Sequence, residues 1–183
     1  KISIYSNDDG IHADGVLTIS DGIIDITKSY EGLEGLQVII NNGDISIVSS
    51  DDGINSTATS GQGIVIGGGN LYILAGGDGL DSNSRTAYSG IVFKGGKTVV
   101  ISTSGGNSAI DTEAGYTYTS GSVLAIMPNG GMTSEATHCS NFSSVAKKIS
   151  MSLSSGKTLT VSVSNSAILS VKIPCNLSAI VIY

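Results

Sequence analysis

The sequence contains no tryptophan, a single arginine (Arg85) and few charged residues, which together make up 13% of the chain. Lys and Arg are too sparse for a basic nucleic-acid-binding patch, and a net charge of −6 would repel nucleic acid and anionic membranes. No apolar run approaches the ~18 residues that a membrane helix needs, so membrane insertion is not expected. No glycine-rich phosphate-binding motif lies in a strand-turn-helix setting.

Cysteine is also scarce, with only Cys139 and Cys175 in the chain. The two could form a disulfide if the protein is extracellular, or they could be free buried thiols, and their spacing does not decide between these alternatives. A cysteine nucleophile beside His138 would lack a third, orienting group. We therefore assign no catalytic residue.

What the sequence does contain is a repeated four-residue unit with an acidic first residue. Its copies are D-G-I-H from Asp9, E-G-L-E from Glu31, D-G-I-N from Asp52 and D-G-L-D from Asp78, with a fifth, S-A-I-D, from Ser108. The apolar residue of the unit recurs at Ile11, Leu33, Ile54, Leu80 and Ile110, with spacings of 22, 21, 26 and 30 residues. This period is typical of a solenoid.

Two further β-rich segments recur in fixed order within each repeat, and turns rich in Gly, Asn and Ser separate them. One series is 16–19, 38–40, 64–66 and 91–93; the other is 24–26, 45–48, 71–74, 99–101 and 123–126. An antiparallel sandwich also has many short strands, but its strands have no reason to resemble every third neighbour. The pattern therefore favours an all-β, single-stranded parallel β-helix with three strands per coil.

The repeats define the expected organisation of the chain. Residues 1–126 form the β-helix coils, and 127–148 break the pattern as a loop, with a short helical turn near Phe142 to Lys148. From residue 149 the strands alternate between apolar and polar residues. We expect 149–183 to form an antiparallel β segment whose hairpins pack on the open end of the solenoid and protect its unpaired backbone groups.

Stacking of the coils would place acidic residues in a ladder, about 4.8 Å apart. Two such charges repel by roughly 1 kcal/mol in water and about 3 kcal/mol at a protein surface, whereas Ca²⁺ midway between coils could bind both carboxylates. With few histidines and no clustered thiols, zinc, copper and iron fit poorly. The candidate metal ligands are Asp8, Asp9, Glu31, Glu34, Asp51, Asp52, Asn55, Asp78, Asp81 and Asp111.

The alternative is that Asp-Gly serves only as turn chemistry. That accounts for Asp21 and Asp44 but not for Glu31-Gly-Leu-Glu34, where two glutamates flank a strand residue. His12, at the variable fourth position of the unit, is expected to be a surface residue and not a ligand.

At these residues the chain resembles a bacterial carbohydrate-binding family of parallel β-helix proteins that bind cellulose and acidic sugars. The resemblance rests on Asp51-Asp52-Gly53-Ile54, on Gly77-Asp78-Gly79-Leu80-Asp81-Ser82-Asn83, on the Gly-Gly turns and on the hairpin segment after the solenoid. It implies a right-handed β-helix similar to family 9 polysaccharide lyases, calcium held by stacked acidic residues, secretion or cell-surface display, and polysaccharide binding without cleavage. The sequence departs from the pattern at Tyr30-Glu31-Gly32, where the usual paired aspartates are replaced.

The expected function is thus that of an extracellular calcium-binding protein that recognises a plant-type polysaccharide, polygalacturonate-like or cellulose. Arg85, Lys94 and Tyr88 are the candidate ligand-binding residues; the other candidate tyrosine faces, for which partial burial is equally compatible, are Tyr5, Tyr30, Tyr72, Tyr116 and Tyr118. Two alternatives stay open. One is a calcium-dependent polysaccharide lyase that uses Arg85 or Lys94 as the base, and the other is a structural or adhesion module.

Overall fold

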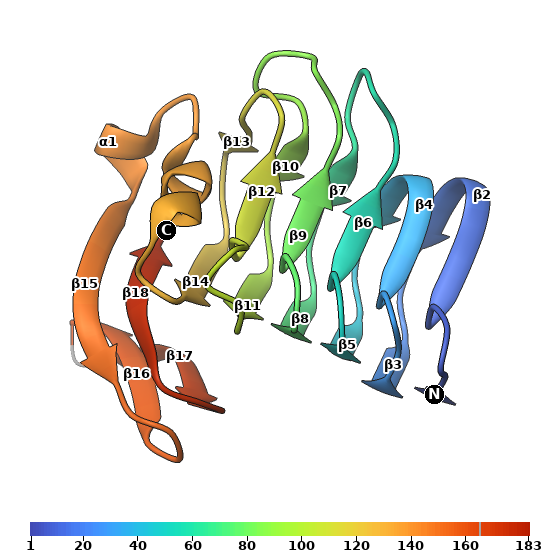
Figure 1. Ribbon diagram of the computed structural model, residues 1–183. Helices are drawn as coiled ribbons and strands as arrows, with labels where there is room; N and C mark the ends of the chain where they lie inside the picture. Colours follow the sequence, from blue (N-terminus) through green and yellow to red (C-terminus); the bar gives the residue numbers. More distant parts are fainter. Residues whose placement is uncertain (165) are drawn as a thin grey trace.

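The computed structural model describes residues 1–164 and 166–183, and it is a parallel β-solenoid followed by antiparallel strands. Successive coils stack side by side from the N-terminus to β14 (Figure 1). The all-β solenoid predicted from the repeats is therefore confirmed. Among the described residues, no helix has the length and apolar character to cross a membrane.

One side of the solenoid, here called the base sheet, receives one strand from each coil. The strands pair in parallel, in register, and are β1 (Ile2–Tyr5), β3 (Ile23–Lys28), β5 (Asp44–Ser49), β8 (Asn70–Ala75), β11 (Lys97–Ser102) and β14 (Ser122–Met127). A glycine with positive φ precedes each of these strands from β3 onward, for example Gly43 at 126° and Gly96 at 79°. Glycine adopts this conformation without a steric cost. These glycines lie in the turns that the sequence predicts before the base strands.

The other two sides share a second sheet that bends. In the first coils one long strand covers both sides, as in β2 (Ile11–Ile19) and β4 (Leu33–Ile40). In later coils it divides into a front strand and a back strand. The front strands are β6 (Ile54–Ser56), β9 (Leu80–Ser82) and β12 (Ile110–Thr112), and the back strands are β7 (Ile64–Ile66), β10 (Ile91–Phe93) and β13 (Thr117–Tyr118).

Loops 57–63 and 83–90 join the front and back strands of their coils. Loop 57–63 explains why the repeat lengthens from 21 to 26 residues while the strands remain in register. The further increase to 30 residues comes mainly from segment 103–109 between β11 and β12, which is three residues longer than segment 76–79 of the preceding coil.

The apolar residue of each repeated unit points inward and forms one column of the core. Leu33, Ile54, Leu80 and Ile110 are fully buried. The preceding glycine is required by close stacking: a Cβ on Gly79 would lie 2.5 Å from the carbonyl oxygen of Ala109 and 2.6 Å from Val100 Cγ1. Ala109 itself occupies the equivalent position in the last coil, where no further coil stacks.

The segment after the solenoid extends the base sheet. The 3-10 helix η1 (Gly131–Thr137) and α1 (Phe142–Val145) lie within the predicted loop, and α1 agrees with the predicted helical turn. Strand β18 (Leu177–Ile182) pairs antiparallel with β14, and β15 (Lys147–Leu153) pairs with β18. The last coil therefore has a paired edge.

The hairpin of β16 (Thr158–Val163) and β17 (Ser166–Lys172) differs from expectation, because it lies against the outer face of the base sheet and not on the solenoid end. The reason is a set of apolar side chains that point outward from the last two coils. Val99, Ile101, Leu124 and Ile126 are buried in a second core together with Leu169 and Val171 of the hairpin. Cys175 packs at this core and Cys139 at the first, and both thiols are free.

Candidate metal centre

The repeated unit brings its polar residues together on the front of the solenoid as two columns that flank the buried apolar column. The second column, formed by the fourth residue of each unit, is in continuous register and consists of His12, Glu34, Asn55, Asp81 and Asp111. The first column consists of Asp9, Glu31, Asp52, Asp78 and Ser108. The predicted acidic ladder is thus present, with neighbouring rungs one strand spacing apart.

The first column has a structural role. The carboxylate Oδ1 of Asp52 accepts a hydrogen bond from the N–H of Asp78 at 2.7 Å, and Oδ1 of Asp78 accepts one from the N–H of Ser108 at 2.5 Å. Asp9 does the same for Glu31 at 3.3 Å. These bonds tie each coil to the next, so backbone capping explains part of the Asp-Gly pattern. For Asp52 and Asp78, they also leave the second carboxylate oxygen without a hydrogen bond from any described residue.

The second column has no such role at Asp81. This carboxylate accepts no hydrogen bond from the residues that the structure describes, although it is half-buried. Burial, together with the nearby charges of Asp52, Asp111 and Asp78, raises its pKa to about 7. Asp81 therefore lies in a desolvated, anionic environment to which the described residues supply no compensating positive group.

The same environment extends along the ladder. Burial raises the pKa of Asp78 to about 7 despite its hydrogen bond from Ser108, and it raises the pKa values of Asp52 and Asp111. Burial also raises the pKa of Glu31 to about 7, against the opposing effect of a hydrogen bond from Asn55. Groups with such shifts are concentrated at binding and catalytic sites, although structural networks produce them as well.

Two buried oxygen atoms in the middle of the ladder have no hydrogen-bond partner among the described residues. Asn55 Nδ2 donates to Glu31 Oε1 at 3.1 Å, but Glu31 Oε2 and Asn55 Oδ1 are buried without a hydrogen bond among the described residues. Buried polar atoms without a partner are costly and rare in folded proteins. A cation bound between these coils would satisfy both oxygens.

At its C-terminal end the ladder opens into an acidic pocket of about 320 Å³. Asp81 and Asp111 line it together with Glu113 and with Glu135 of η1. The charge of Glu135 contributes to the raised pKa of Asp111. Sequence reasoning missed Glu113 and Glu135 because neither belongs to the repeated unit.

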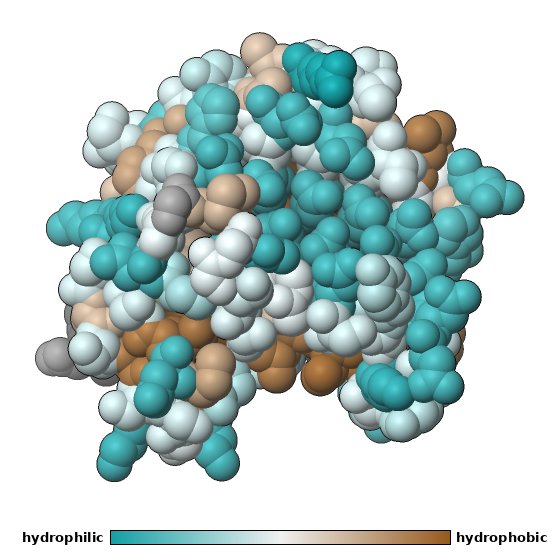
Figure 2. Space-filling model, viewed as in Figure 1, coloured by the Kyte–Doolittle hydropathy of each residue, from teal (hydrophilic) through white to brown (hydrophobic). Residues whose placement is uncertain are grey.

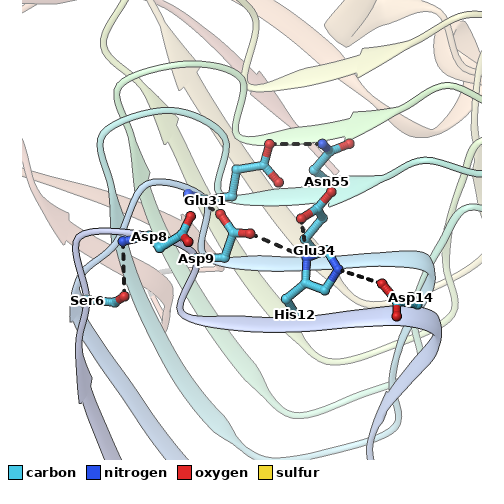
Figure 3. Close-up of polar contacts among 8 residues, drawn as sticks. All are labelled: Ser6, Asp8, Asp9, His12, Asp14, Glu31, Glu34 and Asn55. Atoms are coloured by element: carbon cyan, nitrogen blue, oxygen red, sulfur yellow. Dashed lines mark hydrogen bonds and ion pairs between the residues drawn. The ribbon is translucent and has the colours of Figure 1, made fainter.

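At its N-terminal end the ladder contains its own positive group. His12 Nδ1 lies 2.5 Å from Glu34 Oε2 and 3.4 Å from Asp9 Oδ2, and Nε2 lies 3.3 Å from Asp14 Oδ1 (Figure 3). Hydrogen bonds to Asp14 and Glu34 raise the pKa of His12, so its cationic form is favoured. His12 is half-exposed, as predicted, but it also joins three carboxylates.

One ligand atom from each of Asp9, His12 and Glu34 lies within 4.8 Å of the others, so this group could hold a metal ion. Protonated His12 accounts for the same geometry without a metal, because it forms an ion pair with each neighbour. The stronger case for a cation therefore lies further along the ladder, around Asp52, Asp78, Asp81 and Asp111.

Two predicted ligands lie at the margin of the ladder. Asp8 is exposed, and its backbone N–H bonds to Ser6 Oγ at 3.1 Å (Figure 3). Asp51 raises the pKa of the exposed Tyr30 by accepting a hydrogen bond from its hydroxyl.

The predicted ligand-binding residues fall at two different corners of the solenoid. Arg85 and Tyr88 are exposed on loop 83–90, directly after the front strand that carries Asp81. The Tyr88 ring makes an edge contact with His138, and its φ is 54°. Lys94 is exposed at the far end of β10, on the corner between the back and base strands, so the fold does not bring it to the ladder.

The candidate tyrosines also differ in their exposure to solvent. Tyr5 and Tyr30 are exposed, whereas Tyr116 is fully buried and its hydroxyl donates to the carbonyl of Ala136 at 2.6 Å. Tyr116 is therefore a core residue.

The donors along the ladder from Glu31 to Asp111 are carboxylate and amide oxygens, which suit a hard cation such as calcium. Register spacing allows one ion to bind carboxylates of two adjacent coils, with the second oxygens of Asp52 and Asp78 available. Comparison with protein-family models, with curated proteins and with solved structures finds no match for this chain.

Proposed function

We propose that the protein is an extracellular calcium-binding module that holds acidic, polygalacturonate-like polysaccharide without cleaving it. The observation that carries the proposal is the environment of Asp81. This carboxylate is half-buried, has no hydrogen-bond donor among the described residues, and lies close to Asp52, Asp78 and Asp111.

Bound calcium would stabilise this cluster of carboxylates for three reasons. It neutralises the mutual repulsion of the carboxylates, it binds the oxygens that lack partners, and it accepts six to eight oxygen ligands in flexible geometry. A front-face ladder cannot surround an ion completely, so some coordination positions would remain for other oxygens. Extracellular calcium-binding modules have Kd values on the order of 10⁻⁴ to 10⁻³ M. An affinity in this range would be enough for the site to bind calcium outside the cell.

The open coordination positions link calcium to the polysaccharide. A protein of net charge −6 repels a polyuronate unless a cation joins them. Uronate carboxylates are hard oxygen ligands and could complete the calcium shell. Arg85, on the adjoining loop, could then form a bidentate hydrogen bond with a second carboxylate of the polymer.

Two titrations test this proposal. In the first, calcium is added to metal-free protein in a calorimeter; we expect saturable binding that Asp81→Asn weakens at least tenfold. In the second, oligogalacturonate is added in calcium and in chelator; we expect binding only with calcium.

Asp21→Asn is the matched control, because it removes the same charge from an exposed turn and retains the oxygen that accepts from the Gly22 N–H. Equal calcium affinity in Asp81→Asn and the wild-type protein would exclude this ladder as the calcium site. Calcium binding without any oligogalacturonate binding would instead favour a structural or adhesion module.

A further inference from the structure

The N-terminal end of the ladder differs chemically from its middle, because it contains an imidazole. Figure 2 shows that hydrophilic surface extends over the front strands of the solenoid towards the first coils. There one potential ligand atom from each of Asp9, His12 and Glu34 lies within 4.8 Å of the others. The other histidine of the chain, His138, follows η1 and lies outside the ladder. A nitrogen ligand is therefore available at this end alone.

Two adjacent coils position the three ligand atoms (Figure 3). His12 on β2 and Glu34 on β4 are register partners. Asp9 Oδ1 accepts a hydrogen bond from the N–H of Glu31 at 3.3 Å, and Asp9 Oδ2 lies 3.4 Å from His12 Nδ1. The side chains of Asp9 and Glu34 are only 17% and 19% exposed. The stacked coils therefore restrict where both carboxylates can lie.

The distances suit a small tetrahedral ion. Two ligand atoms that are each about 2.0–2.2 Å from a tetrahedral zinc ion lie about 3.3–3.6 Å apart. The separation of 3.4 Å between Asp9 Oδ2 and His12 Nδ1 is within this range. Glu34 Oε2 lies 2.5 Å from the same nitrogen. It would have to move away by about 1 Å to reach a tetrahedral position, which small rotations of its long side chain provide.

The second imidazole nitrogen contacts a further carboxylate. His12 Nε2 lies 3.3 Å from Oδ1 of Asp14, which is two residues along β2 and so on the same face of the strand. Histidines that bind metals almost always donate their other ring N–H to a carboxylate, a carbonyl or water, and this fixes the tautomer. The Asp14 contact favours a proton on Nε2, which leaves the lone pair of Nδ1 directed at Asp9 and Glu34.

The charge of the cluster favours a divalent cation over a proton. Three carboxylates, those of Asp9, Asp14 and Glu34, surround His12 and carry a formal charge of −3. Protonation of the imidazole reduces this charge to −2, whereas a divalent ion on the neutral imidazole reduces it to −1. The ion takes the Nδ1 lone pair, and the proton that the cationic ring holds there passes to solvent. Zinc accepts nitrogen and carboxylate ligands together, whereas calcium takes oxygen ligands.

We propose that Asp9, His12 and Glu34 bind Zn²⁺ in a second metal site, with Asp14 positioning the imidazole. The scarcity of histidine, which argues against zinc along the rest of the ladder, does not apply where this histidine meets two carboxylates. Three protein ligands leave a fourth coordination position for water. The site shares no ligand with the calcium centre proposed around Asp81 and does not depend on the function proposed for it.

Calorimetric titration of the metal-free protein with Zn²⁺ tests this inference. We expect saturable binding that His12→Gln weakens at least tenfold. His138→Gln is the matched control, because it removes the other, exposed imidazole and should bind zinc as the wild-type protein does. Asp14→Asn retains an oxygen that accepts from Nε2 but removes the charge, so it should weaken binding by a smaller factor than His12→Gln.

Two further titrations identify the ligand and the metal preference. In buffers of different ionisation enthalpy, zinc binding at pH 7 should release protons from the wild-type protein, and the release should be lost in His12→Gln. In excess calcium the zinc affinity should change less than tenfold, because calcium does not prefer a nitrogen ligand.

The absence of zinc binding would mean that the cluster is an ion-pair network around protonated His12, and it would overturn the inference. So would wild-type zinc affinity in folded His12→Gln, equal weakening in His138→Gln, or displacement of zinc by an equal concentration of calcium. Circular dichroism verifies the fold of each variant. If His12→Gln does not fold, Glu34→Gln replaces it and should also weaken binding at least tenfold; wild-type affinity in that variant would equally overturn the inference.

Discussion

Asp81 on β9 and Asp111 on β12 are register partners on adjacent parallel strands, and both carboxylates have raised pKa values because they are buried close to other acids. Neither forms an ion pair with a residue that the structure describes. The fold thus holds two acids one strand spacing apart although they repel each other, and this relationship leads to the first three predictions.

Replacement of Asp81 by Asn should stabilise the metal-free protein, because it removes a charge that is both desolvated and repelled by its neighbours. Thermal unfolding in chelator measures this as a higher midpoint than that of the wild-type protein. Asp21→Asn should leave the midpoint nearly unchanged. A lower midpoint in Asp81→Asn would mean that the carboxylate makes a favourable interaction in the metal-free state.

Calcium should raise the unfolding midpoint of the wild-type protein. A ligand that binds only the native state at a hundredfold excess over Kd contributes about 2.7 kcal/mol, and in a chain of 183 residues this corresponds to a shift of roughly 5–11 °C. The shift should be lost in Asp81→Asn. Identical midpoints in calcium and in chelator would be inconsistent with a native-state calcium site.

The metal-free protein should become less stable as pH rises from about 4 to above 7. The pKa values of Glu31, Asp78 and Asp81 are each raised to about 7 from ordinary values of 4.5, 3.8 and 3.8. Between the two values the folded state binds more protons than the unfolded state, so the free energy of unfolding falls with pH. Urea unfolding in chelator at pH 5 and pH 8 measures the difference, and saturating calcium should reduce or reverse it. Equal stability at both pH values would show that these carboxyls titrate normally.

The positions of the two basic candidates predict different effects on polysaccharide binding. Arg85→Ala should weaken calcium-dependent binding of oligogalacturonate severalfold, because Arg85 lies on the loop that follows β9. Lys94→Ala, on another corner, should have no effect. Incubation of the wild-type protein with polygalacturonate should give no rise in ultraviolet absorbance from unsaturated uronate. A calcium-dependent rise that either variant abolishes would establish the lyase alternative.

Close stacking at the glycine column predicts different causes of instability for substitutions at equivalent positions of two adjacent coils. Gly79→Ala should lower the free energy of unfolding by about 1–3 kcal/mol, because its Cβ would contact the backbone of Ala109 and the side chain of Val100. The change one coil later, Ala109→Gly, forms no such contact, but it removes a fully buried methyl group and adds conformational entropy, so it should cost about 1–2 kcal/mol. Urea unfolding measures both variants. A loss below about 0.5 kcal/mol in Gly79→Ala would mean that the coils can separate locally to admit a methyl group.

The repeated unit made the register predictable, because every copy places an apolar residue between two polar ones. It could not predict Glu135, which reaches the acidic pocket from η1, outside the repeat. Nor did it predict that His12 joins Asp14 as well as its ladder neighbours. Contacts of this kind depend on how irregular segments pack, and sequence spacing does not encode that packing.

The position of the hairpin had a sequence signal that the repeat analysis did not use. Strand β3 alternates apolar and polar residues, as expected for a sheet with one solvated face, whereas β11 and β14 carry nearly continuous apolar runs. Such runs indicate burial on both faces. They mark the part of the base sheet that the hairpin covers.

The corner between front and back strands varies in length while the coils above and below it remain in register. The length of loops 57–63 and 83–90 therefore varies without a shift in the register of the acidic residues. Their sequences could be exchanged or lengthened without moving the carboxylates of the ladder. In this sense the spacing of the acidic row is set by the stacked strands alone and is independent of the loops beside it.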